Sequence, residues 1–591
     1  MNFKKISALA VFTVMLILLL MIPSFALGNM DYANEAPGGV VSNADEFVAA
    51  LGKENAVKVS EREIKLKNSV VLESTITITN GTYTLNSLGC TIYRGFEQGA
   101  LFLLDGSSLS QHPSLSFGRV NAEMTADGIE PDLTLDGCKD VYPNADGSLV
   151  IVKGGATLNV YGSILLKNAY NIGMGGAIFV ELGVQDEGSY STPLEPTVLL
   201  KNCKIEHCSA ELGGGAVAFI GYYNMIDVGY LSIQNVSFTG NTSANELGLG
   251  AGGAIYSVGG TVNVATATFT ECVSDKGGAM YIASEAIISD VTAENNLAKV
   301  GGGVLYVGAE EDIAGKVTIN NLYATNNKSE GNAGVIENNG TVTANGIYFS
   351  SNECSRNGGT VYNRGTFIMQ EGSMLHNDAG VSGGGVYCEG EKSVFKLEGG
   401  EINSNDAVFA GALFSDVLVE ITGGAVGRND SAEPHLVLKG IVKFGKNANV
   451  LGSNTIGLCI TKNEDGTDNV PIIEIDGAST ILDYMYVGFF REKTDKDGSV
   501  TGYKTANKSG RAVFVGNADD IKSSEKWYVV YSKGPVSYTI RENGTLSPRF
   551  LFLPVWAWFI IVPALSAGGF FGYKKINTLV KKKKAAKATA Q

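Results

Sequence analysis

Acidic side chains are the first residues in this sequence that could carry chemistry. The densest run, DGIEPDLTLDGCKD, contains four aspartates: Asp127, Asp132, Asp136 and Asp140. Carboxylate oxygens suit Ca2+, yet the run lacks the D-x-[DN]-x-[DN]-G spacing and the glutamate at the twelfth position of a calcium-binding loop. We interpret the run as a solvated loop with Asp-Gly turns and keep a Ca2+ site as the alternative. No other cofactor is expected.

Paired carboxylates would indicate a glycoside hydrolase, in which two of them project into one groove about 5–10 Å apart. In the repeated segments of this chain, the acids do not recur two residues apart on a strand. Glycine pairs are frequent, but none is followed by the Lys-Ser/Thr of a phosphate-binding loop, so they predict turns. We therefore predict no catalytic, cofactor-binding or metal-ligating residue in the repeats, although loops from distant coils could supply one.

Cysteine and histidine offer little more. The four His are too far apart for a His-rich metal site. The eight Cys form no CxxC pair, and several of them fall on strand or corner positions of the repeat. An even number of Cys outside the cell allows disulfides. We predict mostly buried free thiols, with one or two disulfides as the alternative.

The elements that would position such residues are set by an internal repeat. A glycine cluster such as GGAIF (175–179) or GGAIY (252–256) returns at intervals of 25 to 39 residues. A period near 25 with occasional insertions is typical of one coil of a solenoid. The glycines aligned by this repeat are Gly176, Gly215, Gly253, Gly278, Gly303, Gly359 and Gly385, with weaker copies at Gly334 and Gly411.

A second element precedes most of these clusters. Segments such as VNVATATFTEC (262–272) alternate apolar and polar residues, which predicts a strand with one buried face. Most end in an Asn, a residue that suits a sharp left-handed corner and can hydrogen-bond along a stack. Equivalent residues of successive coils stack about 4.8 Å apart. We predict an inward Asn column at Asn241, Asn296, Asn327, Asn352, Asn377 and Asn405, with Cys208 and Cys272 as replacements and a column of Phe, Tyr and Ile in the interior.

Together these signals predict an all-β protein, a right-handed parallel β-helix. FTGN (238–241) and FSSN (349–352), paired with the glycine clusters, resemble the FxxN and GGA[ILV] repeat of the polymorphic outer membrane proteins. The resemblance covers about 160–430 and implies a β-helix and an adhesin function. That family ends in an outer-membrane β-barrel, whereas this chain ends in one apolar segment with a Lys tail, so an autotransporter is not expected.

The flanks complete the predicted organisation. Residues 27–59 form the predicted N-terminal segment, with a short helix over 42–58 that has Phe47, Val48 and Leu51 on one face. We interpret this helix as a cap on the first coil, because open sheet edges are usually covered. Irregular first coils occupy 60–160 and regular repeats 161–430. Residues 431–548 keep the strand pattern without the glycine cluster. They are interpreted as closing coils or a C-terminal β cap, with a small β-sandwich as the alternative.

The two ends indicate export and anchoring. Residues 1–26 have a basic start, an apolar run and Ser-Phe-Ala at the end, which is typical of a cleaved signal peptide; an uncleaved anchor is the alternative. Residues 550–573 carry no charge and predict a transmembrane helix over 549–574, with a basic cytoplasmic tail at 575–591. A buried core helix is the alternative there. The expected location is the cell membrane, single-pass, with the body outside a bacterial cell.

Charge and architecture narrow the function. The body, 27–549, has a net charge of −24, which argues against nucleic-acid binding. The expected partners are the cytoplasmic membrane and an extracellular glycan or protein ligand. We expect an adhesin-like or ligand-display protein, with binding loops in the insertions at 181–196, 220–230 and 307–316. A polysaccharide lyase or glycoside hydrolase of the same fold, and a structural stalk, are the alternatives.

Overall fold

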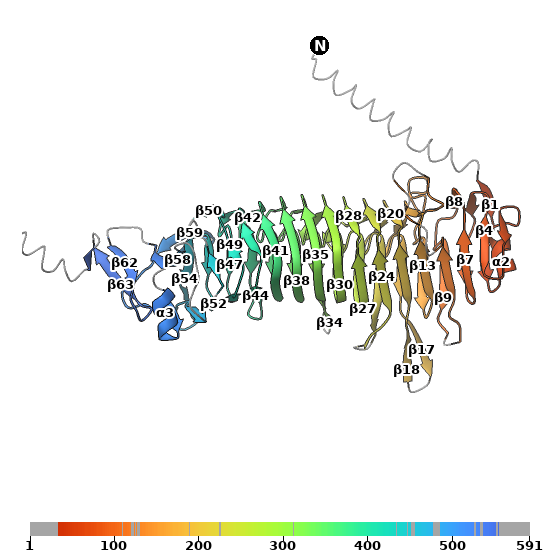
Figure 1. Cartoon of the computed structure of the whole chain (residues 1–591). Helices are drawn as coiled ribbons and strands as arrows, with labels where there is room; N and C mark the ends of the chain where they lie inside the picture. The colour runs from red at the N-terminus through yellow and green to blue at the C-terminus, as the bar shows by residue number, and fades with distance from the viewer. Residues whose placement is uncertain are drawn as a thin grey trace, which may run out of the picture.

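The computed structural model describes residues 33–554, except for 109, 120–122, 125, 127–129, 188–189, 224–225, 311–312, 433, 446, 451–454, 477–484, 525–527, 532–535 and 551–552. These residues form an elongated rod, along which the order in the sequence is the order in space (Figure 1). The rod is a β-solenoid: each coil pairs in parallel with the coil before it and the coil after it.

The strands of successive coils form four columns, which run along the rod; among the described residues, the first and the closing coils have no strand in the fourth column. The first column follows the glycine cluster, and the second follows the first around the coil. The first column contains β9 (Phe102–Gly106), β12 (Val150–Gly154), β16 (Ile178–Glu181), β22 (Val217–Tyr223), the starts of β27 (Ile255–Ala265) and β30 (Met280–Glu294), β32 (Leu305–Val307), β37 (Ile336–Asn338), β40 (Val361–Asn363), β43 (Val386–Cys388), β47 (Leu413–Ser415), β51 (Leu436–Leu438), β54 (Thr455–Cys459) and β58 (Met485–Thr494). The second column contains β4 (Glu63–Leu66), β7 (Thr82–Asn86), β10 (Ser114–Phe117), β13 (Thr157–Tyr161), β19 (Thr197–Lys201), β24 (Tyr230–Gln234), parts of β27 and β30, the starts of β35 (Lys316–Thr325), β38 (Thr341–Ser350) and β41 (Thr366–Leu375), β44 (Val394–Leu397), β48 (Leu418–Ile421), β52 (Val442–Gly445), β57 (Ile473–Asp476) and β60 (Phe514–Gly516).

The third column ends at the Asn corner, and the fourth joins that corner to the next glycine pair. The third contains β5 (Val70–Leu72), β8 (Cys90–Arg94), β11 (Leu133–Asp136), β14 (Ile164–Lys167), β20 (Lys204–Glu206), β25 (Ser237–Thr239), β28 (Thr268–Thr270), the ends of β30, β35, β38 and β41, β45 (Glu401–Asn403), β49 (Ala425–Val426) and β53 (Asn449–Val450). The fourth contains β15 (Tyr170–Asn171), β21 (Ser209–Ala210), β26 (Thr242–Ser243), β29 (Val273–Lys276), β31 (Leu297–Gly301), β36 (Lys328–Ser329), β39 (Glu353–Cys354), β42 (Asp378–Ser382), β46 (Asp406–Phe409) and β50 (Asp430–Ala432).

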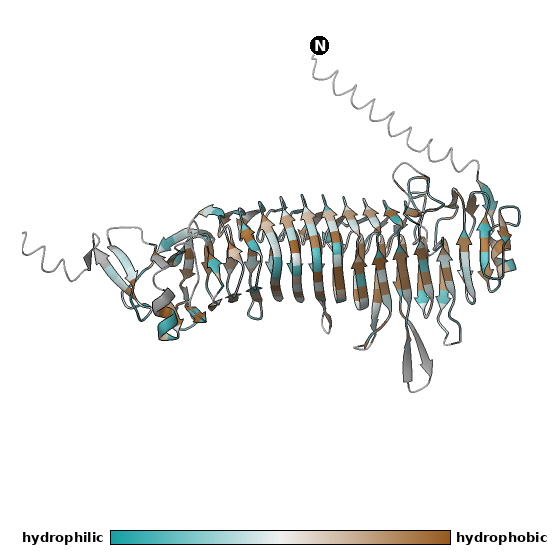
Figure 2. Cartoon of the chain, viewed as in Figure 1, coloured by the Kyte–Doolittle hydropathy of each residue, from teal (hydrophilic) through white to brown (hydrophobic). Residues whose placement is uncertain are grey.

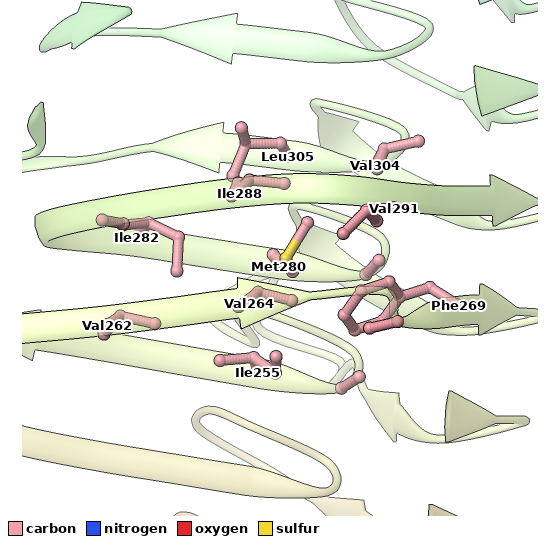
Figure 3. Close-up of a cluster of buried hydrophobic side chains, with 14 of the residues drawn as sticks. Ile255, Val262, Val264, Phe269, Met280, Ile282, Ile288, Val291, Val304 and Leu305 are labelled. Atoms are coloured by element: carbon pink, nitrogen blue, oxygen red, sulfur yellow. The ribbon is translucent and has the colours of Figure 1, made fainter. Parts of the chain in front are cut away.

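The core is one continuous apolar column inside the coils. Burial alternates along many strands, for example over residues 261–265 of β27, and the hydropathy changes along the arrows (Figure 2). Ile255, Val264 and Phe269 of one coil lie beside Met280 and its neighbours in the next coil (Figure 3), and all four are fully buried. The Phe238 and Phe269 rings stack inside with centroids 4.8 Å apart. This repeat distance is the spacing of neighbouring strands, so the sheet imposes it on the core.

The N-terminal end is covered by α2 (Ala44–Ala50). Its N-cap Asn43 accepts a hydrogen bond from the Glu46 backbone N–H at 2.9 Å, and two acidic residues in the first turn favour the helix dipole. Phe47 is fully buried and its ring packs edge-on against Tyr83 at 5.6 Å. The parallel sheet begins before this helix rather than near residue 60, because β1 (Asn34–Ala36) and β2 (Gly39–Val41) already pair with β5 and β6 (Ile76–Ile78).

The C-terminal part continues the coils. The strands β51, β52, β53, β54, β57, β58, β60 and β61 (Tyr528–Val530) extend the same parallel sheet, so the described part of 431–530 continues the coils and forms no separate sandwich. Two antiparallel additions project from these coils: β55 (Thr461–Lys462) pairs with β56 (Asp468–Asn469), and β59 (Val500–Thr505) pairs with β58. A short helix, α3 (Ala518–Ser524), precedes an antiparallel sheet of β62 (Val536–Ile540), β63 (Leu546–Phe550) and β64 (Leu553–Pro554).

The predicted membrane segments lie largely outside the described residues. The signal at 1–26 and residues 555–591 are not covered, while residues 549 and 550 belong to β63 and residues 553 and 554 to β64, so the predicted helix does not start at 549. In the part of the chain that is described, no helix has the length and apolar character needed to cross a membrane.

Candidate functional site

The Asn column is a hydrogen-bonded ladder along the inside of the corner. From Asn327 onward, the amide oxygen of each Asn accepts from both the backbone N–H and the side-chain NH2 of the Asn one coil earlier; for Asn327 and Asn352 these distances are 2.9 and 3.0 Å. The side-chain NH2 also donates to backbone carbonyls, so every polar group of these buried amides has a partner. The continuous ladder runs through Asn296, Asn327, Asn352, Asn377, Asn405 and Asn429.

The ladder differs from the sequence prediction in three details. Asn429 extends it by one coil, which the sequence analysis missed because no FxxN motif marks that position. Asn241 is fully buried but stands apart, since Cys272 replaces the next Asn; its amide oxygen accepts from the Cys208 backbone N–H at 3.0 Å. The left-handed residue at the corner is the one before the ladder, for example Ser351 with φ +58° and not Asn352.

The two glycines of each pair have different physical roles. The first takes positive φ, +69° at Gly302, and Ala333 adopts +55° at the equivalent position. The second lies against the next coil: a Cβ at Gly303 would collide with the carbonyl oxygen of Gly334. The weaker copies of the motif therefore keep the second glycine and lose the first. The second-glycine column consists of Gly176, Gly215, Gly253, Gly278, Gly303, Gly334, Gly359, Gly384 and Gly411.

The glycine register is corrected at one position. Val386 pairs with Val361, so Gly384 is the equivalent of Gly359, and Gly385 occupies the position that Thr360 holds one coil earlier. Three consecutive glycines made the two alignments indistinguishable in the sequence.

The Tyr of the glycine cluster points outward, contrary to the predicted interior column. Tyr281 stacks on Tyr306 with ring centroids 5.3 Å apart, and Tyr362 stacks on Tyr387 at 5.2 Å. Glu337 stands between these two stacks, in register with Tyr306 and Tyr362. The first column therefore carries an outer aromatic ladder with one carboxyl inserted in it.

Glu337 is a buried acid in this ladder. Its side chain is 6% exposed, with Oε1 3.5 Å from Nη1 of Arg364, while Oε2 has no hydrogen-bond partner among the described residues. Burial raises the pKa of Glu337 to about 7, against the opposing effect of the Arg364 guanidinium. Arg364 also pairs with Glu389 at 2.9 Å and lies over the Tyr362 ring. Because Glu337 is covered, we assign this cluster to the packing of the outer ladder.

The thiols and the acidic run carry no chemistry that the structure reveals. All eight Cys are buried and free, and burial raises the pKa of seven of them: to about 12 in six, such as Cys203 and Cys354, and further in Cys138. Asp136 accepts from the Cys138 backbone N–H at 2.9 Å and lies 3.4 Å from Nζ of Lys167. Asp127 falls outside the described residues, and within the described ones no group of three or more His, Cys, Asp or Glu could hold a metal ion.

A cleft opens on the outer face of the second column, in the first coils of the rod. Four strands there, β4, β7, β10 and β13, pair in register, so Glu63, Thr84, Ser116 and Asn159 form one outward row. In the neighbouring row, Gly118 leaves a gap between the side chains of two adjacent coils. Gly118 has φ +75°, and a Cβ there would collide with the Tyr161 carbonyl oxygen, so the gap is built into the backbone.

Two adjoining hollows of about 400 and 320 Å3 share this gap. Both volumes lie within the roughly 300–1,000 Å3 typical of small-molecule sites. The hollows have Glu63, Asn86, Gly118 and Arg119 in common; the first adds Ser60, Arg62, Thr84, Ser116 and Tyr161, and the second adds Val59, Lys65, Ser87, Leu88, Asp132 and Ile164.

Hydrogen bonds organise the floor of the cleft. Asn86 donates to Oε1 of Glu63 at 2.7 Å, and Arg119 Nη2 lies 3.6 Å from the same oxygen. Asn159 donates to Ser116 at 3.1 Å, and Tyr161 donates to Asn159 at 3.1 Å. These contacts fix the side chains but leave the rim open, because the Arg119 side chain is 76% exposed. The sequence analysis missed this cleft, since its residues come from coils of unequal length.

The cleft also brings two carboxylates and two cations together. Glu63, Asp132, Lys65 and Arg119 all line the smaller hollow. Such a constellation can bind sugar hydroxyls through hydrogen bonds and charged groups through ion pairs.

The three predicted insertions leave the rod at one corner, between the first and second columns. The segment 181–196 forms the hairpin of β17 (Gly183–Glu187) and β18 (Tyr190–Leu194). The segment 220–230 pairs the end of β22 with β23 (Ile226–Asp227), and 307–316 pairs β33 (Ala309–Glu310) with β34 (Ile313–Ala314). The β17–β18 hairpin and β34 project from the same edge of the rod (Figure 1).

Comparison with protein-family models, curated proteins and solved structures finds no match for this chain. The resemblance to the polymorphic outer membrane proteins therefore depends on the repeat residues alone.

Proposed function

We propose that this protein is a membrane-anchored bacterial cell-surface protein of the adhesin-like class, which uses its N-terminal cleft to bind an extracellular glycan. The cleft formed by β4, β7, β10 and β13 is the observation that carries the proposal. It combines an open hollow, a row of hydrogen-bonding side chains and an aromatic wall at Tyr161. Sites of this kind, with an apolar ring beside polar groups that fix orientation, suit sugars.

The location of the cleft supports a display function. It lies in the first coils, at the end of the rod far from the C-terminal strands (Figure 1). We propose that 1–26 directs export, that the uncharged segment after β64, up to residue 573, spans the cytoplasmic membrane and that the Lys-rich tail stays inside. The rod, whose crossovers we take to be right-handed as is usual for parallel strands, then holds the cleft away from the cell.

The second candidate is a polysaccharide lyase or glycoside hydrolase. It is favoured by one observation, that Glu63 and Asp132 line the same hollow together with Lys65 and Arg119. Two carboxylates and a base are the groups that such reactions use. A structural stalk without ligand is the third candidate, and repeat motifs like those of the polymorphic outer membrane proteins support the adhesin over it.

A glycan screen on the full chain in detergent micelles tests these candidates, with and without Ca2+. Binding without product release is the expected result. Release of reducing ends or unsaturated products would replace the adhesin with the enzyme. Binding of no glycan would contradict the proposal and leave a protein ligand or a stalk.

A further inference from the structure

We infer that the N-terminal cleft selects an acidic glycan, one whose sugars carry carboxylate or sulfate groups. This inference rests on the proposed function and adds the ligand class. Its basis is the local surplus of positive charge: Arg62, Lys65 and Arg119 line the two hollows, against the carboxylates of Glu63 and Asp132.

This surplus runs against the charge of the whole rod. The body has a net charge of −24, so at long range it repels a polyanion, and a cation-rich cleft is a local exception. A binding site for neutral sugars needs hydroxyl and amide groups but has no use for several exposed cations. A site for an acidic sugar uses the neutral polar groups for the sugar hydroxyls and the cations for the acidic groups, because guanidinium groups bind carboxylate and sulfate oxygens in a bidentate manner.

The guanidinium groups are placed for such contacts. Glu63 holds Arg119 through a single long contact, 3.6 Å from Nη2, and leaves the other donors of this exposed side chain available. Arg62 is exposed on the same rim, and its guanidinium makes no ion pair with any described residue. Gly118 adds no side chain to the hollow that Tyr161 and both arginines line.

Matched variants and matched ligands test the inference on the full chain in micelles. The probes are an oligogalacturonide, the same oligomer fully methyl-esterified, and a sulfated and a plain dextran oligosaccharide. Arg62→Gln and Arg119→Gln each remove one cation from the rim. Arg356→Gln is the control, because Arg356 is an exposed arginine of the same rod far from the cleft. Circular dichroism verifies that each variant is folded.

The expected result is binding of one charged probe, carboxylated or sulfated, with loss on removal of its charge. Whichever probe binds identifies the anionic group. Each cleft variant should weaken binding about tenfold, which corresponds to about 1.4 kcal/mol, and Arg356→Gln less than twofold. Equal binding of the charged and uncharged oligomers, or an equal loss in Arg356→Gln, would overturn the inference. Cleft-dependent binding of a neutral glycan would overturn it too, yet leave the proposed function standing, whereas binding of no glycan would contradict both.

Discussion

Replacing Asn352 by alanine tests how the inner ladder stabilises the solenoid. The side chain takes part in five hydrogen bonds: it accepts two from Asn327 and donates to Asn377, Ala324 and Ser350. Asn352 is only 1% exposed, so water cannot replace these partners. The backbone N–H of Asn327 and the amide oxygen of Asn377 would each lose a partner inside the rod.

The magnitude follows from these contacts. A net contribution of about 1 kcal/mol per hydrogen bond gives a loss of about 3–5 kcal/mol in the free energy of unfolding. Asn345→Ala is the matched control, since Asn345 lies in the same coil, on β38, but is exposed, and it should change stability by no more than about 0.5 kcal/mol. Urea unfolding followed by circular dichroism gives the midpoint shift, and hydrogen exchange shows whether protection is lost in the neighbouring coils.

Two results would refute this reasoning. Equal midpoint shifts for the two alanine variants would mean that the ladder contributes no more than an outward Asn. A loss of protection spread evenly over the rod would contradict the expectation that each coil depends mainly on its neighbours.

Three further predictions follow from the same structure. Gly303→Ala should destabilise by about 3 kcal/mol, because its Cβ would lie 2.1 Å from the Gly334 carbonyl oxygen of the next coil. Gly302→Ala should cost less, about 1–2 kcal/mol, for positive φ and a looser contact of 2.5 Å with the Leu305 carbonyl oxygen, since Ala333 already occupies the equivalent position one coil later. Equal costs in thermal unfolding would contradict the two roles. Folding raises the pKa of Glu337 from 4.5 to about 7, so the folded state favours the protonated carboxyl. The free energy of unfolding should therefore fall by about 3 kcal/mol as the pH rises from 4.5 to 7. Glu337→Gln should remove that fall; an unchanged pH profile would show that Glu337 is not the cause. The eight thiols should resist a thiol reagent in the native state and react after unfolding, while rapid labelling of the native protein would contradict their burial.

Much of the regular rod could be predicted from the sequence because its physics is periodic. One coil repeats about every 25 residues, and each regular coil needs the same inward Asn and the same close-packed glycine. Both residues therefore recur in the sequence at the period of the coil. The sequence could not show that the first glycine of each pair adopts positive φ and the second packs against the next coil, since both requirements select glycine. The register at Gly384 was ambiguous for the same reason.

The outward features were harder to predict. The Tyr of the glycine cluster recurs like a core residue, and only the pairing of Tyr281 with Tyr306 shows that the ring points out. The cleft has no period at all, because Glu63, Arg119 and Tyr161 come from coils separated by irregular loops. The one available signal was Gly118, a glycine outside the repeat that directly precedes an arginine.

Hydrogen exchange of the full chain, with and without the glycan that binds it best, tests the central claim most directly. The account predicts that the ligand slows exchange in β4, β7, β10 and β13, and leaves exchange in the β17–β18 hairpin and the fourth column unchanged. Protection centred on the hairpins or on the fourth column would contradict the assignment of the N-terminal cleft as the binding site.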